Sequence, residues 1–244
     1  MHEWIVPSWP VGDTVKAVIT TRAGGFSQAP YDSLNLGDHV GDDPAVVARN
    51  RAFLKRELAL PGEPNWLTQV HGCDVVPCGS GQSRADAVIT DQPGQVCAVL
   101  TADCLPVLIA DRAGRKVAAV HAGWRGLSAG VIENAVHALA LPGEELLAWL
   151  GPAIGPAQFE VGAEVREVFI QHNPAAEAAF VNNRPGHWLA DIYQLARLRL
   201  NAFNLSYVGG GEYCTVSDQA RFFSYRRDGV TGRMAALIWI ESKI

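Results

Sequence analysis

Apolar and β-branched residues gather in three short runs in the middle of the chain, and each run has the length of a β-strand. The runs are Val96–Leu100, Leu105–Ala110 and Val117–Val120. Ala113-Gly114 lies between the last two and predicts a β-hairpin there. Similar patterns predict further strands at Val15–Thr20, Trp66–Val70, Ala87–Thr90, Leu146–Leu150, Leu205–Val208 and Met234–Ile240.

Helical patterns are interspersed irregularly among these strands. Asp43-Pro44 supplies an N-cap and a proline for the first helical position, and a helix ending near Pro61 follows. Further helices are predicted over Val131–Leu139, up to Phe169 and from Ile192 to Leu200. Because regular βαβ alternation and long polar linkers are both missing, we expect a mixed α/β (α+β) fold and a single domain spanning residues 1–244.

Composition and charge exclude one class of partner. The 244 residues are 48% hydrophobic and 18% charged, which is typical of a globular protein with a sizeable core. Acidic and basic residues are spread evenly and give a net charge of −5, so the sequence offers no basic face to a nucleic-acid backbone. We therefore expect no nucleic-acid partner.

The expected location follows from the signals that the sequence lacks. Met1–Pro10 has neither the basic nor the apolar region of a signal peptide, and no apolar run reaches the length of a membrane span. The five cysteines are an odd number without a Cys-x-x-Cys pair, which is typical of reduced thiols rather than disulfides. These features predict a cytoplasmic protein that does not contact a membrane.

His71, Cys104 and His121 each fall at the end of a predicted strand. One thiolate and two imidazoles suit Zn²⁺, and three protein ligands leave a fourth position for water or substrate. The alternative is that Cys104 is a buried thiol packed as a small hydrophobic residue, and that backbone hydrogen bonds satisfy both histidines. The three residues lie far apart in the sequence, so both interpretations stay open.

Four other features are candidates for chemistry. Asp103 suits a general acid/base or a partner that orients a ligand histidine, and equally a turn. Arg22 precedes a glycine loop whose backbone N–H groups can hold an anion, or form a simple tight turn. Arg125 begins a predicted helix, where an anion can bind, or lies in solvent. Phe222–Asp228 combines aromatic rings with cations, which suits a planar or anionic ligand or a strand edge.

Several known signatures are missing. The sequence has no GxGxxG, no Walker-type loop, no Gly-x-Ser-x-Gly elbow and no zinc nucleobase deaminase motif. Its seven histidines are scattered, and Met1 and Met234 are the only methionines available as an axial copper ligand. Copper is therefore a possible but disfavoured metal, and multicopper oxidase chemistry is disfavoured by the supply of ligands.

The chain resembles the bacterial YfiH family, which is also known as the laccase-domain or polyphenol oxidase family, as purine nucleoside phosphorylase and as peptidoglycan editing factor. The resemblance covers essentially the whole chain, and no motif position departs from it. It runs through Thr21–Gly25, Ser33–Gly37, Gln69–Gly72, Thr101–Pro106, His121–Gly126 and Phe222–Asp228.

The resemblance implies that His71, Cys104 and His121 bind zinc together, in a multi-layer α/β sandwich with mixed sheets whose pocket opens on the metal. It also implies a small-molecule substrate. The associated reactions are phosphorolysis of adenosine, inosine, guanosine and methylthioadenosine, with hydrolytic deamination of adenosine alongside. We expect a monomer or a weak homodimer.

For such a reaction the resemblance allows roles to be assigned. Arg22 and Arg125 are the candidates for binding phosphate, Asn35 for the purine or ribose, and Asp103 for moving the proton. A runner-up is an amide hydrolase that removes wrongly incorporated L-serine from peptidoglycan precursors. Its nucleophile would be zinc hydroxide or a Cys104 thiolate. The remaining alternatives are a copper-dependent polyphenol oxidase (laccase) and a metal-binding protein without turnover.

Overall fold

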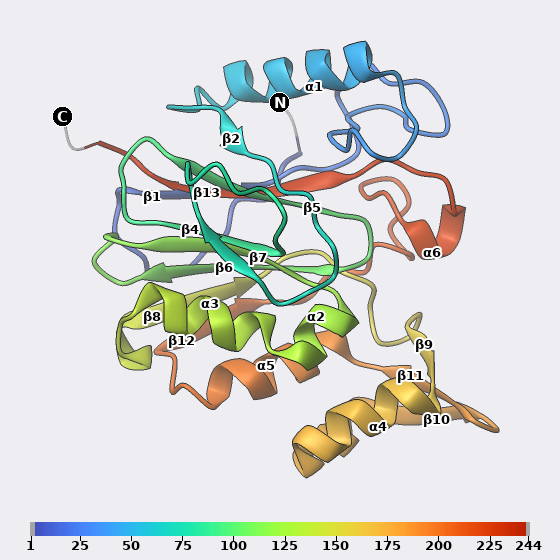
Figure 1. Ribbon diagram of the computed structural model, residues 1–244. Coiled ribbons are helices and arrows are strands. Elements are labelled where there is room, and N and C mark those ends of the chain that lie inside the picture. Colours follow the sequence, from blue (N-terminus) through green and yellow to red (C-terminus); the bar gives the residue numbers. More distant parts are fainter. Residues whose placement is uncertain (1–2, 243–244) are drawn as a thin grey trace.

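Two β-sheets stacked face to face form the centre of the molecule in a computed structural model, which describes residues 3–242 (Figure 1). The four-stranded sheet has the order β1 (Val15–Ile19), β13 (Met234–Ile240), β5 (Val96–Thr101), β2 (Pro64–Asn65). The six-stranded sheet has the order β12 (Tyr207–Gly210), β8 (Leu146–Leu150), β6 (Leu105–Asp111), β7 (Val117–Ala122), β4 (Ala87–Thr90), β3 (Val75–Pro77). Each sheet mixes parallel and antiparallel neighbours, so the expected mixed α+β architecture with mixed sheets is confirmed.

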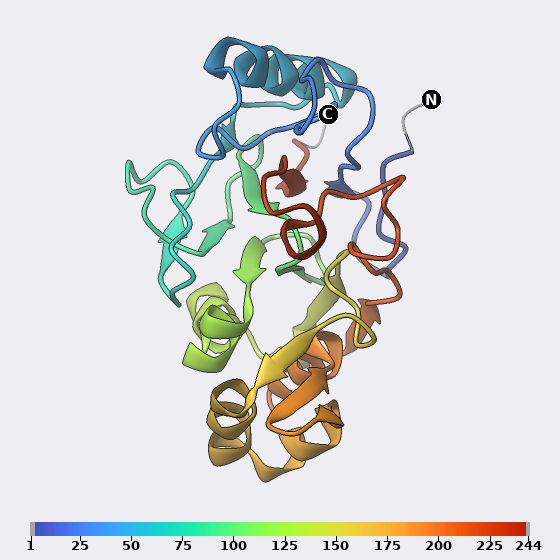
Figure 2. The same cartoon turned by 90° about the vertical axis from the view of Figure 1, so that its right-hand side faces the viewer.

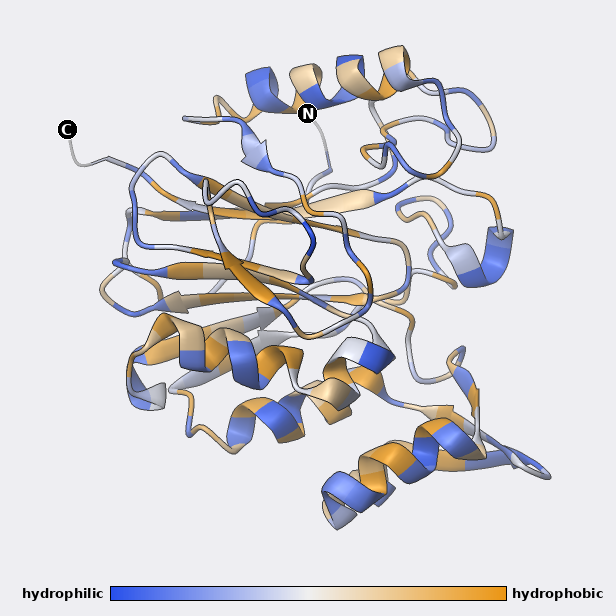
Figure 3. Ribbon diagram, viewed as in Figure 1, coloured by the Kyte–Doolittle hydropathy of each residue, from blue (hydrophilic) through white to orange (hydrophobic). Residues whose placement is uncertain are grey.

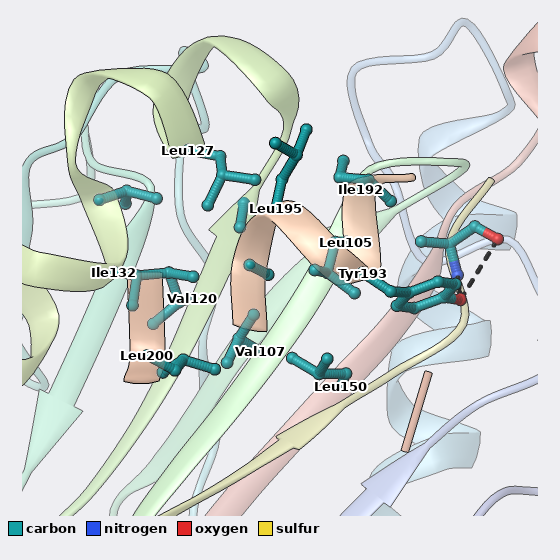
Figure 4. Close-up of a cluster of buried hydrophobic side chains, with 14 of the residues drawn as sticks. Leu105, Val107, Val120, Leu127, Ile132, Leu150, Ile192, Tyr193, Leu195 and Leu200 are labelled. Carbon is teal, nitrogen blue, oxygen red and sulfur yellow. Dashed lines mark hydrogen bonds between the residues drawn. The ribbon is translucent and has the colours of Figure 1, made fainter. Parts of the chain in front are cut away.

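Helices cover the outer face of each sheet. α1 (Pro44–Glu57) packs on the four-stranded sheet, and its N-cap Asp43 accepts a hydrogen bond from the Ala45 N–H at 2.8 Å, as the sequence predicts. The six-stranded sheet is covered by α2 (Trp124–Ala129), α3 (Val131–Leu139) and α5 (Ile192–Asn201), whose apolar side chains interdigitate with those of the strands (Figure 4). The layers therefore follow the order helix, sheet, sheet, helix.

Most central strands are buried on both faces. In β6, Val107 and Ile109 face the helices, whereas Leu108 and Ala110 face the other sheet. Such strands read as continuous apolar runs rather than as apolar–polar alternation, which is why the runs stand out in the sequence. Hydropathy mapped on the ribbon shows the same separation: the central strands carry hydrophobic residues, and the outer helices carry hydrophilic residues alongside hydrophobic ones (Figure 3).

A smaller third sheet extends one end of the molecule. It has the order β10 (Phe180–Arg184), β11 (His187–Ala190), β9 (Glu160–Gly162), and α4 (Ala163–His172) packs against it. Seen from the side, α1 and α4 lie at opposite ends of the stack (Figure 2). The remaining short helices are η1 (Gly143–Glu145), η2 (Pro174–Ala179) and α6 (Tyr225–Asp228).

Several predicted elements need correction. The run Trp66–Val70 is not a strand, because regular pairing ends with β2 and only Thr68 forms an isolated bridge, with Arg84. The strand predicted at Leu205–Val208 begins two residues later, as β12. Phe222–Asp228 ends in the short helix α6 rather than in a strand, because the Ser224 hydroxyl accepts from the Arg227 N–H and caps a turn of helix.

The connection from β5 to β6 has a particular consequence for function. These strands are consecutive in sequence but belong to different sheets, so residues 102–104 cross from one sheet to the other. The crossing lies at the same end of the sheets as α6 and the start of α2, on the right-hand side of Figure 1. Within residues 3–242, no helix is long and apolar enough to span a membrane.

Candidate metal centre

The structure brings the three predicted ligands together. Cys104 lies where the chain enters β6, His121 is the penultimate residue of β7, and His71 lies in a loop with a left-handed φ of 60°. The ligand atoms of all three lie within 4.8 Å of one another, with Sγ of Cys104 3.8 Å from Nε2 of His71. His71 is thus held by a loop and not by the end of a strand, contrary to the sequence prediction.

A buried carboxylate that the sequence analysis missed, that of Asp86, holds two of these ligands in place. It is fully buried and accepts hydrogen bonds from three successive backbone N–H groups, those of Val70, His71 and Gly72, at 3.1, 2.9 and 2.7 Å. Its Oδ1 also lies 2.8 Å from Nδ1 of His121. The bond fixes the imidazole with Nδ1 protonated, so Nε2 remains free as a metal ligand.

Electrostatics at the centre favour the thiolate. Burial raises the pKa of Cys104, but the charge of His121 and hydrogen bonds from both histidines outweigh burial and lower this pKa to about 6. Burial lowers the pKa of His121, but the Cys104 charge and the Asp86 hydrogen bond raise it to about 9. Without a metal, the two side chains therefore form a thiolate–imidazolium pair at neutral pH.

Glycines let the chain approach the ligands closely. A Cβ at Gly123 would lie 2.9 Å from Sγ of Cys104 and 3.1 Å from Cδ2 of His71. A Cβ at Gly126 would lie 2.6 Å from the carbonyl oxygen of Gly72. The glycine spacing of the segment after His121 is therefore explained by the packing of α2 against the ligand-bearing loop.

These residues fit a single metal ion. Zn–S and Zn–N bonds of about 2.3 and 2.1 Å place two ligands of a tetrahedral ion roughly 3.6 Å apart, close to the 3.8 Å between Cys104 and His71. The set of one sulfur and two imidazole nitrogens suits zinc or copper and not magnesium or calcium. Three ligands leave one coordination position open.

A cavity of about 490 Å³ opens on this centre. Its apolar side chains come from β5, from helices α2 and α5 and from the loops that carry Ile154 and Phe159, and its charged side chains are arginines apart from Asp103 and the metal ligands. The lining residues are His39, Gln69, His71, Leu100, Thr101, Ala102, Asp103, Cys104, His121, Trp124, Arg125, Ile154, Phe159, Ile192, Tyr225, Arg226 and Arg233. A planar, polar molecule with an anionic partner matches this lining in size and chemistry.

Asp103 lines the cavity but is also tied to the fold. It has a left-handed φ of 87°, and its carboxylate accepts 2.6 Å hydrogen bonds from the Thr215 hydroxyl and from the Arg226 N–H. These hydrogen bonds agree with the interpretation of Asp103 as a structural aspartate, and the acid/base role stays a prediction that its place in the cavity wall allows. A non-glycine residue held in this conformation is typical of functional sites.

The three predicted substrate-binding residues are placed differently. Arg125 lines the cavity and lies over the Trp124 ring, 4.3 Å from its centroid. Arg22 lies outside the cavity, where it binds Asp32, and its glycine loop uses the N–H groups of Gly24 and Gly25 to hold the Ser33 hydroxyl at 3.1 Å. The two glycine N–H groups are thus already engaged within the protein.

Asn35 is fully buried and belongs to the scaffold. Its Nδ2 donates to the Gly37 carbonyl and to Asp42, and its Oδ1 accepts from the N–H groups of Gly37 and Arg233. Every hydrogen-bonding atom of the side chain is therefore engaged within the protein. We expected Asn35 to contact a purine or ribose, but its side chain has no free hydrogen-bonding atom for such a contact.

Two cationic lining residues come from the C-terminal part of the chain. Arg226 lies in the aromatic and cationic segment that the sequence analysis singled out, and its guanidinium binds the carbonyls of Gln158 and Glu160. Arg233 carried no signal in the sequence. It reaches the cavity because β13 pairs with β5, so that Met234 faces Thr101 across the ladder.

The fold and the site together define a class of protein, a helix–sheet–sheet–helix sandwich with a His–Cys–His group able to hold a metal where the chain crosses between sheets. Residues 16–241 match the family of multi-copper polyphenol oxidoreductase laccases. The chain belongs to this family, which is the laccase-like family of the YfiH proteins.

Relatives and solved structures agree along the whole length. A purine nucleoside phosphorylase of Pseudomonas aeruginosa is 54% identical over 243 residues, covering 99% of this chain and 100% of the relative. The purine nucleoside phosphorylase YfiH of Escherichia coli is 54% identical and covers 98% and 100%. The crystal structure of a Neisseria meningitidis protein of the DUF152 family is 48% identical, with a TM-score of 0.94 and 98% and 99% coverage.

Proposed function

We propose that the protein is a zinc-dependent purine nucleoside phosphorylase that acts on adenosine, inosine, guanosine and methylthioadenosine and also deaminates adenosine. The observation that carries this proposal is the His–Cys–His group at the floor of a 490 Å³ cavity with aromatic and cationic walls. The names of relatives at 54% identity support the same reaction.

Phosphorolysis needs three things of the protein. A phosphate oxygen forms a bond to the anomeric carbon of the ribose while the bond to the purine nitrogen breaks, and the purine leaves with the electron pair and gains a proton. Cations must hold the phosphate, an apolar surface must hold the base, and a group must supply the proton. The cavity offers arginines, the rings of Trp124 and Phe159, and the carboxyl group of Asp103 for these roles.

In this proposal both reactions depend on the metal ligands, and the second reaction uses the metal directly. Zinc, when bound, is a Lewis acid that makes hydroxide available near neutral pH, which hydrolytic deamination requires. His71, Cys104 and His121 would hold it, with Asp86 fixing the two histidines. Cys104 acts as a ligand in this proposal and not as a nucleophile, because a sulfur bonded to zinc is a weak nucleophile.

The deciding experiment is incubation of metal-analysed, zinc-loaded protein with adenosine, with and without phosphate. Adenine and ribose 1-phosphate that form only with phosphate demonstrate phosphorolysis, and inosine formed without phosphate demonstrates deamination. Cys104→Ala is expected to remove zinc and both activities together. Full activity in that variant would refute the proposal, since the metal centre would then have no part in turnover.

A second candidate function has one specific observation in its favour. A Cys104 thiolate beside the His121 imidazolium is the pair that cysteine hydrolases use, which fits amide hydrolysis of serine-containing peptidoglycan precursors. This chemistry needs the metal-free form. Release of L-serine from such a precursor by zinc-free protein, and its loss on adding zinc, would distinguish this function from phosphorolysis.

The family description also raises copper oxidase chemistry. Within residues 3–242, His71, Cys104 and His121 form the one group of three or more His, Cys, Asp or Glu side chains able to hold an ion. A multicopper cluster needs several such groups, so we propose zinc and not copper as the metal.

We further infer that the chain works as one domain, as a monomer or weak homodimer in the cytoplasm, and without a nucleic-acid or membrane partner. The family match spans residues 16–241 without a break, which supports a single unit. All five cysteines are free thiols, which suits a reducing compartment. The substrate class is a small molecule, because the cavity is of the size that encloses one.

A further inference from the structure

An anion subsite must exist in the metal-facing cavity if the proposed phosphorolysis occurs, and Arg22 cannot supply it. Arg22 is bound to Asp32 outside the cavity, and the N–H groups of its loop hold a hydroxyl. Three other arginines, Arg125, Arg226 and Arg233, line the cavity itself. Their surroundings differ and single out one of them.

Arg226 and Arg125 are less suited to bind an anion tightly. The guanidinium of Arg226 faces two backbone carbonyls, those of Gln158 and Glu160, at 3.4 and 3.2 Å. Arg125 is exposed and rests on the ring of Trp124, so its charge is well solvated. Arg226 is thus directed toward backbone oxygens, and Arg125 toward the ring of its neighbour.

Hydrogen bonds hold both the backbone and the side chain of Arg233. Its backbone N–H donates to Oδ1 of Asn35 at 2.9 Å, and its Nη1 donates to the carbonyls of Thr231 and Gly232 at 2.9 and 3.1 Å. Gly37 leaves room for its stem, since a Cβ there would lie 2.8 Å from Cγ of Arg233. The buried amide of Asn35 therefore orients this arginine, which gives that residue an indirect part in the site.

Among the described residues no carboxylate lies within ion-pair distance of Arg233, and the charges of Cys104 and Asp103 favour its charged form only from farther away. Several other partly buried arginines in the molecule form ion pairs, such as Arg199 with Glu133 and Arg227 with Asp228, at 2.6 and 2.7 Å. Only Nη1 of Arg233 is engaged, with carbonyl oxygens, so Nη2 and Nε keep donor capacity toward the cavity. Charged groups in partly buried positions are normally paired, so an unpaired one facing a cavity indicates a missing anionic ligand.

Thr101 provides a second, independent indication. Thr101 is one of the residues that line the same cavity, it is only 2% exposed, and its buried side-chain oxygen has no hydrogen-bond partner. Thr101 pairs with Met234 at the end of the β5/β13 ladder, which brings it next to Arg233. Buried hydroxyls are usually hydrogen-bonded, so the orphaned one points to a ligand atom.

We infer that Arg233 and Thr101 form the phosphate subsite of this cavity, with the guanidinium and the hydroxyl donating to the phosphate oxygens. This inference rests on the proposed phosphorolysis for the identity of the anion, while the binding site itself rests on the two side chains. Thr101 ends β5 and Arg233 precedes β13 of the four-stranded sheet, whereas His121 lies in β7 and Cys104 precedes β6 of the six-stranded one.

The test is calorimetric titration of zinc-loaded protein with inorganic phosphate, comparing wild type with Arg233→Met and Thr101→Val. The expected Kd for phosphate rises at least about tenfold in Arg233→Met and about threefold to tenfold in Thr101→Val. Arg56→Met is the matched control, since Arg56 lies on the exposed face of α1 and pairs with Glu57. Its Kd should equal that of wild type.

The outcomes separate the subsite from the proposed reaction. Phosphate binding that is lost in both variants while no nucleoside is cleaved would support the subsite and refute phosphorolysis. Phosphorolysis with an unchanged KM for phosphate in both variants would refute the subsite and leave the reaction intact. Absence of phosphate binding in wild type would also overturn the subsite. Thr101→Val is nearly isosteric, so it decides the matter if Arg233→Met fails to fold.

Discussion

The carboxylate of Asp86 and the imidazole of His121 form a buried pair 2.8 Å apart, and the same carboxylate holds the backbone of the loop that carries His71. Burial raises the pKa of Asp86, but hydrogen bonds from His121 and from the loop outweigh burial and keep this pKa below its ordinary value. An ionised carboxylate only accepts, so His121 must donate from Nδ1. One residue thereby sets the position of one ligand and the tautomer of another.

Asp86→Asn is expected to weaken zinc binding by about 10- to 100-fold, because the carboxamide cannot accept from all four donors. If its NH₂ faces His121, the imidazole carries its proton on Nε2 and cannot bind the metal. Competition with a chromophoric chelator measures the affinity, and denaturant unfolding measures the stability, which should fall by about 3 kcal/mol.

Asp111→Asn provides the control for this prediction. Asp111 is also fully buried and accepts backbone N–H bonds, from Arg115 and Lys116, but it lies at the opposite end of β6 from Cys104. Its replacement should lower the stability and leave the zinc affinity unchanged. An equal loss of zinc affinity in both variants would show that Asp86 acts only through general stability.

Gly123→Ala is expected to lower zinc affinity by at least about tenfold with little change in stability. The backbone at Gly123 has a φ of −62°, which alanine adopts without strain, so the added methyl group acts only through its contacts with Cys104 and His71. Gly12→Ala, whose Cβ would meet its nearest atom at 3.4 Å, is the control. Unchanged zinc affinity in Gly123→Ala would mean that the ligands can shift at no cost.

The sequence predicts what depends on local signals. The β6/β7 hairpin, the cap of α1 and the apolar runs of the central strands are short-range features, and the structure contains them where expected. The proximity of Cys104 and His121 follows from the hairpin, because Pro106 faces His121 across it. The start of β6 and the end of β7 lie at the same end of the hairpin, and this is enough to bring the two residues together.

Features that depend on distant contacts are not predictable in this way. Asp86 reaches His121 because β4 pairs with β7 in a register that places Ala87 opposite Val120, and a single sequence does not show register. The signal that could have pointed to it is an aspartate at the start of an apolar strand. The same holds for Arg22, whose glycine loop binds the Ser33 hydroxyl, and for the end of Trp66–Val70, where Val70 donates to Asp86 instead of to a neighbouring strand.

Cys104 of zinc-free protein is expected to react with iodoacetamide as a thiolate, with a rate that rises through pH 6 and is flat above about pH 7.5. A pKa of about 6 leaves roughly 90% of the thiol ionised at pH 7, compared with a few per cent for an ordinary cysteine. Peptide mass spectrometry measures the rate at each cysteine. Cys97 is the internal control, because burial raises its pKa and it should stay unmodified.

Zinc should protect Cys104 from this reaction, because the sulfur becomes a ligand. Protection that zinc confers equally on every cysteine would indicate general stabilisation instead. A rate that rises only near pH 9 would contradict the thiolate–imidazolium pair. It would also remove the observation that favours amide hydrolysis as the second candidate function.

Asp103→Asn is expected to lower kcat for phosphorolysis by about 10²- to 10⁴-fold, if Asp103 carries the proton as proposed. Asparagine tolerates the left-handed φ of 87°, can still accept from the Arg226 N–H, and can donate to the Thr215 oxygen. The fold, the zinc content and the KM for nucleoside should therefore change little.

Thr215→Val tests the structural role of Asp103 alone, since it removes one of the two hydrogen bonds that the carboxylate accepts and leaves the carboxyl group in place. A small loss of kcat in Thr215→Val with a large one in Asp103→Asn identifies proton transfer, whereas equal losses would assign Asp103 to the scaffold.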